Sequence, residues 1–225
     1  MAKKELLPAD AAAADEPAGK VRQILAAARH LFLEQGYGDT SMDAVAKRAG
    51  VSKATLYVHF ESKERLFAEV INQARARLRD AIVAIASEAH SDPVETLRLI
   101  GLQFMRFVTN HDSLTLFRTV IGETRRFPQL GQTIFQTGSR DLLELIATII
   151  GDAAARGELT VENPRAAAAH FVALIKSDLH LRCLLVSFYQ AEEADIRRNV
   201  EAGVAVFMSH YGPRDPRPDA ARPSA

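Results

Sequence analysis

Apolar residues along this chain recur at the three- and four-residue spacing of helices, and sustained two-residue alternation is nearly absent. The first clear element starts near Lys20, and its apolar face comprises Val21, Ile24, Leu25, Ala28, Leu31 and Phe32. Gly36 is placed to end this helix as a C-terminal cap. The same spacing predicts further long helices at about 63–89, 93–109, 112–125, 128–137, 139–156, 164–188 and 192–210. The pattern therefore predicts an all-α fold.

Two short helices are predicted between the first helix and residue 63. Thr40 is a suitable N-cap for the first of them, and Asp43 occupies the capping-box position three residues later. Gly50 stands at a tight turn, and Ser52 then caps a second short helix with Leu56 on its buried face. Two helices of about eight residues behind a supporting helix form the arrangement that lays a helix into the DNA major groove.

The charge of this segment favours DNA, although the whole chain carries 28 basic and 28 acidic side chains. Residues 44–60 contain no acid and three basic residues, Lys47, Arg48 and Lys53. Because phosphates attract local positive charge, we expect a DNA-binding surface here rather than over the whole molecule.

The segment that best defines a family is TSMDAVAKRAGVSKATLYVHFESKERLF, from Thr40 to Phe67, which resembles the signature of the TetR family of bacterial repressors. A second segment, LFRTVIGETRRFPQL from Leu116 to Leu130, is similar to C-terminal domains of the AcrR- and AefR-like branch. The resemblance implies an N-terminal three-helix helix-turn-helix DNA-binding domain and a C-terminal helical ligand-binding and dimerisation domain. We expect these at 20–66 and 67–211, between disordered tails at 1–19 and 212–225.

Carried over by position, the resemblance makes residues 52–59 the recognition helix. Lys53, Ala54 and Thr55 would then lie nearest the base edges, with Tyr57 and His59 on phosphates. Hydroxyls, helix N-termini and lysine are suitable phosphate donors. The complete set of DNA-binding candidates is Thr40, Ser41, Ser52, Lys53, Ala54, Thr55, Tyr57, His59 and Lys63. The alternatives are helix capping alone for the residues Thr40, Ser41 and Ser52, and packing on the first helix for Tyr57.

The resemblance also implies a homodimer that pairs the last two long helices of each copy. Their apolar faces are larger than one small body needs, and include Phe171, Leu174, Leu181, Leu184, Leu185, Ile196, Val200, Val204 and Phe207. An ordinary intramolecular core is the alternative for these residues.

A ligand pocket is predicted from aromatic and aliphatic residues of the C-terminal body with a few polar anchors. The candidates are Phe104, Phe107, Phe117, Ile121, Phe135 and Phe171, with Arg118, Glu123 or Arg125 as anchors. Core packing is again the alternative. His180 and Cys183 are three residues apart, but Asp178 falls on a different helix face, so we expect packing and no metal site.

These observations predict a ligand-responsive, sequence-specific transcriptional regulator, a repressor released from a palindromic operator in double-stranded DNA by a small lipophilic or aromatic compound. The alternative is a DNA-binding regulator or architectural protein with no small-molecule effector. We expect no enzyme and no cofactor, because the chain has no phosphate-cradling glycine loop and no HExxH, CxxC or GxSxG motif. The single cysteine and the lack of an apolar stretch of about 18 residues favour a cytoplasmic protein with no membrane partner.

Overall fold

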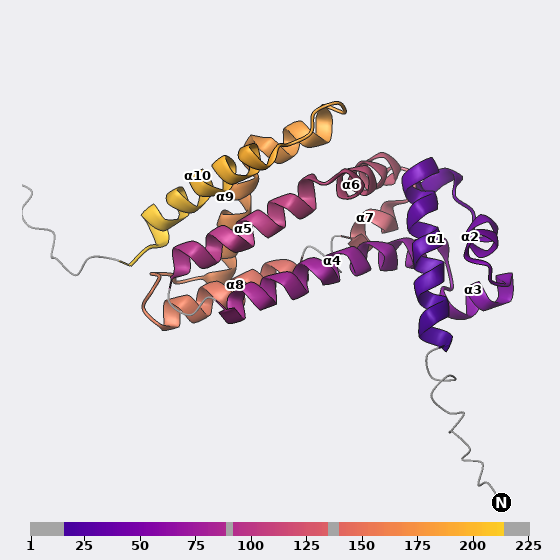
Figure 1. The fold of residues 1–225 in the computed structure, drawn as a ribbon, viewed down its shortest axis with the longest axis horizontal. Helices are drawn as coiled ribbons and strands as arrows, with labels where there is room; N and C mark the ends of the chain where they lie inside the picture. The colour runs from indigo at the N-terminus through magenta and orange to yellow at the C-terminus, as the bar shows by residue number, and fades with distance from the viewer. Residues whose placement is uncertain (1–15, 89–91, 135–139, 214–225) are drawn as a thin grey trace, which may run out of the picture. The chain divides into compact units, whose positions relative to one another are not determined.

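The computed structural model describes residues 16–88, 92–134 and 140–213. Within those ranges the chain forms helices and no strands, which confirms the all-α prediction. The helices are α1 (Glu16–Asp39), α2 (Met42–Ala49), α3 (Lys53–His59), α4 (Lys63–Glu88), α5 (Pro93–Thr109), α6 (His111–Glu123), α7 (Pro128–Ile134), α8 (Arg140–Ala155), α9 (Pro164–Leu185) and α10 (Glu193–Tyr211) (Figure 1). Of these described helices, none has the length and apolarity needed to span a bilayer.

Several helix ends differ from the predicted ones. Helix α1 begins at Glu16, so residues 16–19 of the predicted tail are helical, while residues 1–15 and 214–225 lie outside the described ranges. Gly36 interrupts α1 at the predicted place, with φ 80° and ψ 177°, a conformation available essentially to glycine alone. Helix α9 ends at Leu185 rather than at residue 188, because Val186 takes an extended conformation.

The chain forms two compact units, each built from discontinuous segments. Unit 1 comprises residues up to 75 together with 115–136, and therefore holds α1 to α3, the first half of α4, most of α6 and α7. Unit 2 comprises residues 76–114 and those from 137 onward, and holds the rest of α4 with α5, α8, α9 and α10. The segment of α6 and α7 therefore returns to the unit that contains the two short helices.

Aromatic side chains form the centre of unit 1. The ring centroids of Phe32 and Phe67 lie 4.8 Å apart in an edge-to-face contact, and those of Tyr37 and Phe67 lie 5.1 Å apart. Phe127, from the α6–α7 segment, packs its ring 5.3 Å from that of Tyr37. Other buried residues from this segment in the same core are Leu116, Val120 and Leu130. The position of α1 and α4, against which the short helices pack, thus depends on residues distant in sequence.

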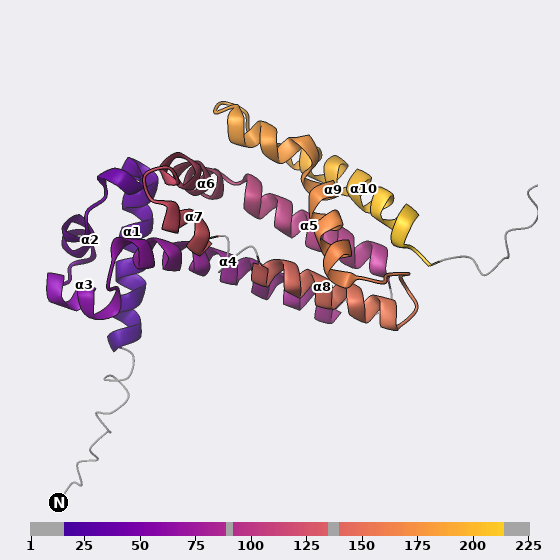
Figure 2. The same ribbon diagram turned by 180° about the vertical axis from the view of Figure 1, so that it is seen from behind.

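The second half of α4 and helices α5, α8, α9 and α10 form the core of unit 2, with α10 packed beside both α5 and α9 (Figures 1 and 2). The rings of Phe171 and Phe207 meet edge to face at 5.6 Å. Gly203 allows α9 and α10 to approach closely, since a Cβ at this position would lie 3.0 Å from the backbone nitrogen of Ile175.

This core corrects the predicted dimer surface. Five of the residues assigned to it are buried inside unit 2: Phe171, Ile196, Val200, Val204 and Phe207. For them the intramolecular alternative is right, because the helix face that carries them is covered by neighbouring helices of the same chain. Leu174 and Leu184 pack partly against that core, whereas Leu181 and Leu185 are 54% and 72% exposed.

Candidate DNA-binding site

Helix α2 begins at a serine cap. The Oγ of Ser41 accepts a hydrogen bond from the backbone N–H of Ala44 at 3.1 Å. The predicted cap, Thr40, is instead buried, and its Oγ1 donates to the carbonyl of Gly36 at 2.7 Å. The prediction that Thr40 caps α2 is therefore wrong: the threonine hydroxyl is used to join the end of α1 to the start of α2.

The turn after α2 is fixed by Gly50, whose φ of 68° and ψ of 27° place it in the left-handed region. The N–H of Gly50 donates to the carbonyl of Lys47 at 3.3 Å, and the N–H of Val51 donates to that of Ala46 at 3.1 Å. This pair of hydrogen bonds is the Schellman motif, which closes a helix and redirects the chain. It sets the direction in which α3 leaves α2.

Helix α3 has one buried and one exposed face. The Oγ of Ser52 caps it by accepting from the N–H of Thr55 at 3.0 Å, and Leu56 is completely buried in the core of unit 1. The predicted contact residues Ser52, Lys53 and Ala54 are exposed, Tyr57 is 44% exposed, and Thr55 and His59 are half-buried. The structure thus brings the predicted residues of α3 together on one accessible surface.

Val58, which is not among the predicted contacts, also belongs to this surface. Its side chain is 82% exposed. The signal was present in the sequence, because two residues beyond a buried Leu56 correspond to a turn of about 200° around a helix. An exposed apolar side chain on such a helix is suited to contact the methyl group of thymine.

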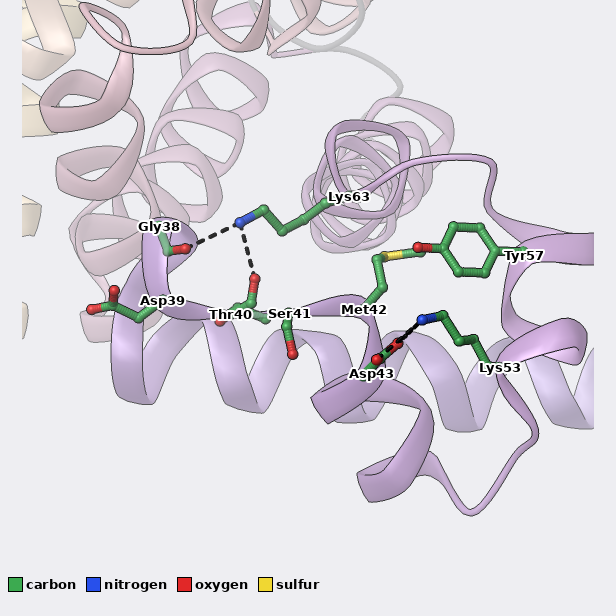
Figure 3. A pocket seen from close by; sticks show the side chains of 9 residues that line it. All are labelled: Gly38, Asp39, Thr40, Ser41, Met42, Asp43, Lys53, Tyr57 and Lys63. Carbon is green, nitrogen blue, oxygen red and sulfur yellow. Dashed lines mark hydrogen bonds and ion pairs between the residues drawn. The ribbon is translucent and has the colours of Figure 1, made fainter.

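The charged group of Lys53 is not free in this structure. Its Nζ lies 2.8 Å from Oδ1 and 3.1 Å from Oδ2 of Asp43, in the first turn of α2 (Figure 3). The hydrogen bond to this carboxylate raises the pKa of Lys53. A cation predicted to read DNA is therefore held by an acid of the neighbouring helix.

Lys63 is engaged more completely. Its Nζ donates to the carbonyl oxygens of Tyr37 at 2.8 Å, Thr40 at 2.9 Å and Gly38 at 3.2 Å. The ammonium also lies 4.4 Å from the centre of the Tyr37 ring, and partial burial lowers the pKa of Lys63. An ammonium has three N–H donors, and all three are used here. In this structure Lys63 therefore joins the end of α1 to the start of α4. The phosphate contact stays a prediction.

An open cleft of about 440 Å³ lies where α1 ends and α2, α3 and α4 approach one another. The residues around it are Gly38, Asp39, Thr40, Ser41, Met42, Asp43, Lys53, Tyr57 and Lys63 (Figure 3). The serine hydroxyl, the N-terminus of α2 and the tyrosine hydroxyl are donors suited to a phosphate at this place. A capped and tightly turned pair of short helices with an exposed polar face defines a helix-turn-helix DNA-binding protein.

Comparison with known proteins identifies the family. Residues 24–70 match the family model described as bacterial regulatory proteins of the tetR family, and residues 95–213 match the AefR-like transcriptional repressor C-terminal domain. The chain therefore belongs to the TetR family of bacterial transcriptional regulators, with an AefR-like C-terminal domain. Proteins of this family are DNA-binding regulators and not enzymes.

Individual relatives agree with this assignment. The Flavonoid-responsive Regulator FrrA is 32% identical, with 88% of this chain and 100% of FrrA covered and a TM-score of 0.70. A TetR-family regulator from Mesorhizobium loti MAFF303099 is 28% identical, with 87% and 98% covered and a TM-score of 0.79. The regulator UidR of Escherichia coli K12 is 29% identical over 142 residues, which are 61% of this chain and 68% of UidR.

The predicted ligand-pocket residues are divided between the two units. Phe104 and Phe171 are buried in the core of unit 2, with Phe107 packed against it. The remaining described candidates belong to unit 1, namely Phe117, Arg118, Ile121, Glu123 and Arg125, and Phe135 lies outside the described residues. Phe117 and Ile121 are 40% and 53% exposed. Core packing, the alternative reading, describes Phe104 and Phe171, and the pocket itself stays a prediction.

Proposed function

We propose that this regulator is a repressor that binds a palindromic operator as a homodimer and leaves it when a small lipophilic or aromatic compound binds its C-terminal helices. The observation that carries the proposal is the accessible face of α3, held by its caps and by the Gly50 turn in the geometry of a recognition helix.

The proposed DNA contacts are a revised set. The contacts to bases come from Lys53, Ala54, Thr55 and Val58, and the contacts to phosphates come from Ser41, Ser52, Tyr57 and His59. Thr40 and Lys63 act indirectly, since their polar groups are bonded to the backbone between Gly36 and Thr40. They maintain the position of α2 relative to α1 and α4.

Exposed apolar residues on unit 2 support the proposed dimer. Leu181 and Leu185 are one turn apart on α9, Phe188 beyond it is 90% exposed, and Val206 on α10 is 53% exposed. Apolar side chains of this size gain from being covered by a second copy. Leu185→Glu is expected to give monomers by sedimentation at a concentration at which the native chain is dimeric. The matched control is Val94→Glu, which adds the same charge at a 42% exposed valine of α5.

The effector class follows from one supporting fact. FrrA, similar over 88% of this chain, is named for its response to flavonoids. We therefore propose an aromatic effector and would use flavonoid aglycones as the first probes. Thermal stabilisation together with release of DNA would support the proposal. Operator binding that no compound of a broad panel alters would favour a regulator with no small-molecule effector.

The central experiment is selection of DNA from a random duplex pool by the purified chain at about 100 mM salt, where phosphate contacts are strong. An enriched palindrome is expected, because a two-fold dimer presents two identical α3 helices. Lys53→Ala should weaken binding to the operator and relax the base preference at one position in each half-site. Arg156→Ala is the control, since it removes a cation from an exposed ion pair in unit 2. Binding without enrichment would contradict sequence-specific recognition.

A further inference from the structure

The ion pair between α2 and α3 has an unusual position for a DNA-binding surface. Asp43 lies in the first turn of α2, and Lys53 is the first residue of α3, so the pair connects the two ends that face the cleft (Figure 3). Both side chains remain exposed, at 65% for Asp43 and 62% for Lys53. A negative charge on a surface that must approach phosphates opposes binding, so its placement calls for an explanation.

The geometry of the pair leaves part of the ammonium available. Oδ2 of Asp43 accepts a hydrogen bond from Nζ of Lys53 at 3.1 Å, and Oδ1 lies 2.8 Å from the same Nζ in an ion pair. The other lysine beside the cleft, Lys63, has its donors directed to backbone carbonyls. Lys53 is thus paired with Asp43 and keeps N–H donors beyond the one that Asp43 accepts, whereas an unpaired lysine side chain would rotate among many rotamers.

We propose that Asp43 is a specificity-determining residue that acts through Lys53. By holding the ammonium, Asp43 prevents Lys53 from reaching phosphates in arbitrary registers, and it aims the N–H groups that the carboxylate does not take up at an acceptor on a base edge. Non-specific DNA loses a phosphate contact, while the operator keeps its base contact. The inference rests on the proposed role of Lys53 in base recognition and extends it to a residue that does not itself touch the base.

The test is Asp43→Asn, measured on two probes: a 30-base-pair duplex of mixed random sequence and the operator enriched in the selection. Each phosphate contact contributes a slope of about 0.9 to the plot of log affinity against log salt concentration. At 0.1 M salt this is about eightfold in affinity relative to 1 M salt. For each copy of the chain that contacts DNA, Asp43→Asn should therefore tighten binding to the mixed duplex about fivefold to tenfold and steepen the salt slope by about 0.9. The affinity for the operator should rise less than this or fall. The specificity ratio, which is the affinity for the operator divided by the affinity for the mixed duplex, therefore decreases.

The same substitution in a Lys53→Ala background separates the mechanism from simple charge removal. If Asp43 acts through Lys53, Asp43→Asn no longer changes the ratio in that background. If removing the negative charge only weakens repulsion of DNA, Asp43→Asn raises the affinity for both duplexes equally, in the native chain and in the Lys53→Ala variant alike. That result overturns the proposal. Glu34→Gln, which removes an exposed acid paired with His30 on α1, is the control for charge alone and should leave the ratio unchanged.

Two other results bear on the assignment. A loss of operator affinity with a changed base preference at one position would show that Asp43 contacts a base itself, and would overturn the inference while the helix-turn-helix function stands. Lys53→Ala with an unchanged ratio would instead show that the proposed role of Lys53 has failed. Thermal melting of each variant, with Asp43→Ser as a second substitution, verifies that the folded state is preserved.

Discussion

Replacing Lys63 by methionine tests whether this lysine fastens the helix-turn-helix or contacts DNA. Methionine keeps an unbranched stem of similar length but removes the three donors to the carbonyls of Tyr37, Gly38 and Thr40. Tyr37 and Thr40 are 0% and 1% exposed, so water has poor access to the acceptors that lose their partner.

The expected loss can be estimated from these contacts. A hydrogen bond from a charged donor contributes about 1.5–3 kcal/mol, and a buried acceptor without a partner costs about 1–3 kcal/mol. Because one ammonium serves all three carbonyls and water will replace part of the loss, Lys63→Met should lower the free energy of unfolding by about 2–4 kcal/mol. For a chain of this size that corresponds to a fall in melting temperature of roughly 4–16 °C.

The assay is urea unfolding followed by circular dichroism at fixed protein concentration, since association of copies changes apparent stability. Lys47→Met is the control, because Lys47 is an exposed lysine of α2. Binding to mixed-sequence DNA is measured in parallel over a range of salt. Native-like stability together with a salt slope reduced by about 0.9 for each bound copy would refute the structural role and restore the phosphate contact predicted from the family pattern.

Three further substitutions examine two glycines of the backbone and a buried histidine. Gly203→Ala should destabilise unit 2 by about 1–3 kcal/mol in urea unfolding, because its Cβ would lie 3.0 Å from backbone atoms of Ile175; unchanged stability would mean that α9 and α10 separate easily. Gly50→Ala should cost about 1 kcal/mol in thermal melting and weaken operator binding, because its φ of 68° is unfavourable for alanine; a native-like melting curve would contradict this. Burial and the nearby Lys176 lower the pKa of His180 to about 4. The unfolded chain therefore binds a proton between pH 6.5 and 4 that the folded chain does not, and stability falls as pH decreases through that window. Between pH 7.5 and pH 5 the loss should be about 1–2 kcal/mol larger than in His180→Gln, and identical pH profiles for the two proteins would show that His180 is not responsible.

Helix positions were largely predictable because the signals are local. The apolar spacing in each segment, the Gly36 and Gly50 breaks and the Ser52 cap all depend on residues within a few positions of one another. The choice between Thr40 and Ser41 as a cap was not predictable. It depends on the direction of the chain after Gly36, whose carbonyl takes up the Thr40 hydroxyl.

The roles of the charged residues required contacts between separate helices. Asp43 and Lys53 meet because the turn at Gly50 brings the starts of α2 and α3 together, and Lys63 meets carbonyls that lie between 23 and 26 positions earlier in the chain. A family pattern places such residues near DNA but does not say which of their donors are already occupied.

By itself, the sequence determined the all-helical class, the helix-turn-helix and its exposed recognition face, because periodicity, capping and turn chemistry act over short distances. Only the tertiary structure decided which apolar faces are covered. Phe171 and Phe207 face each other across α9 and α10 and form core, whereas Leu185, on the same helix as Phe171, is left exposed. An apolar face specifies that something must cover it, and which partner does so is set by the packing of the whole chain.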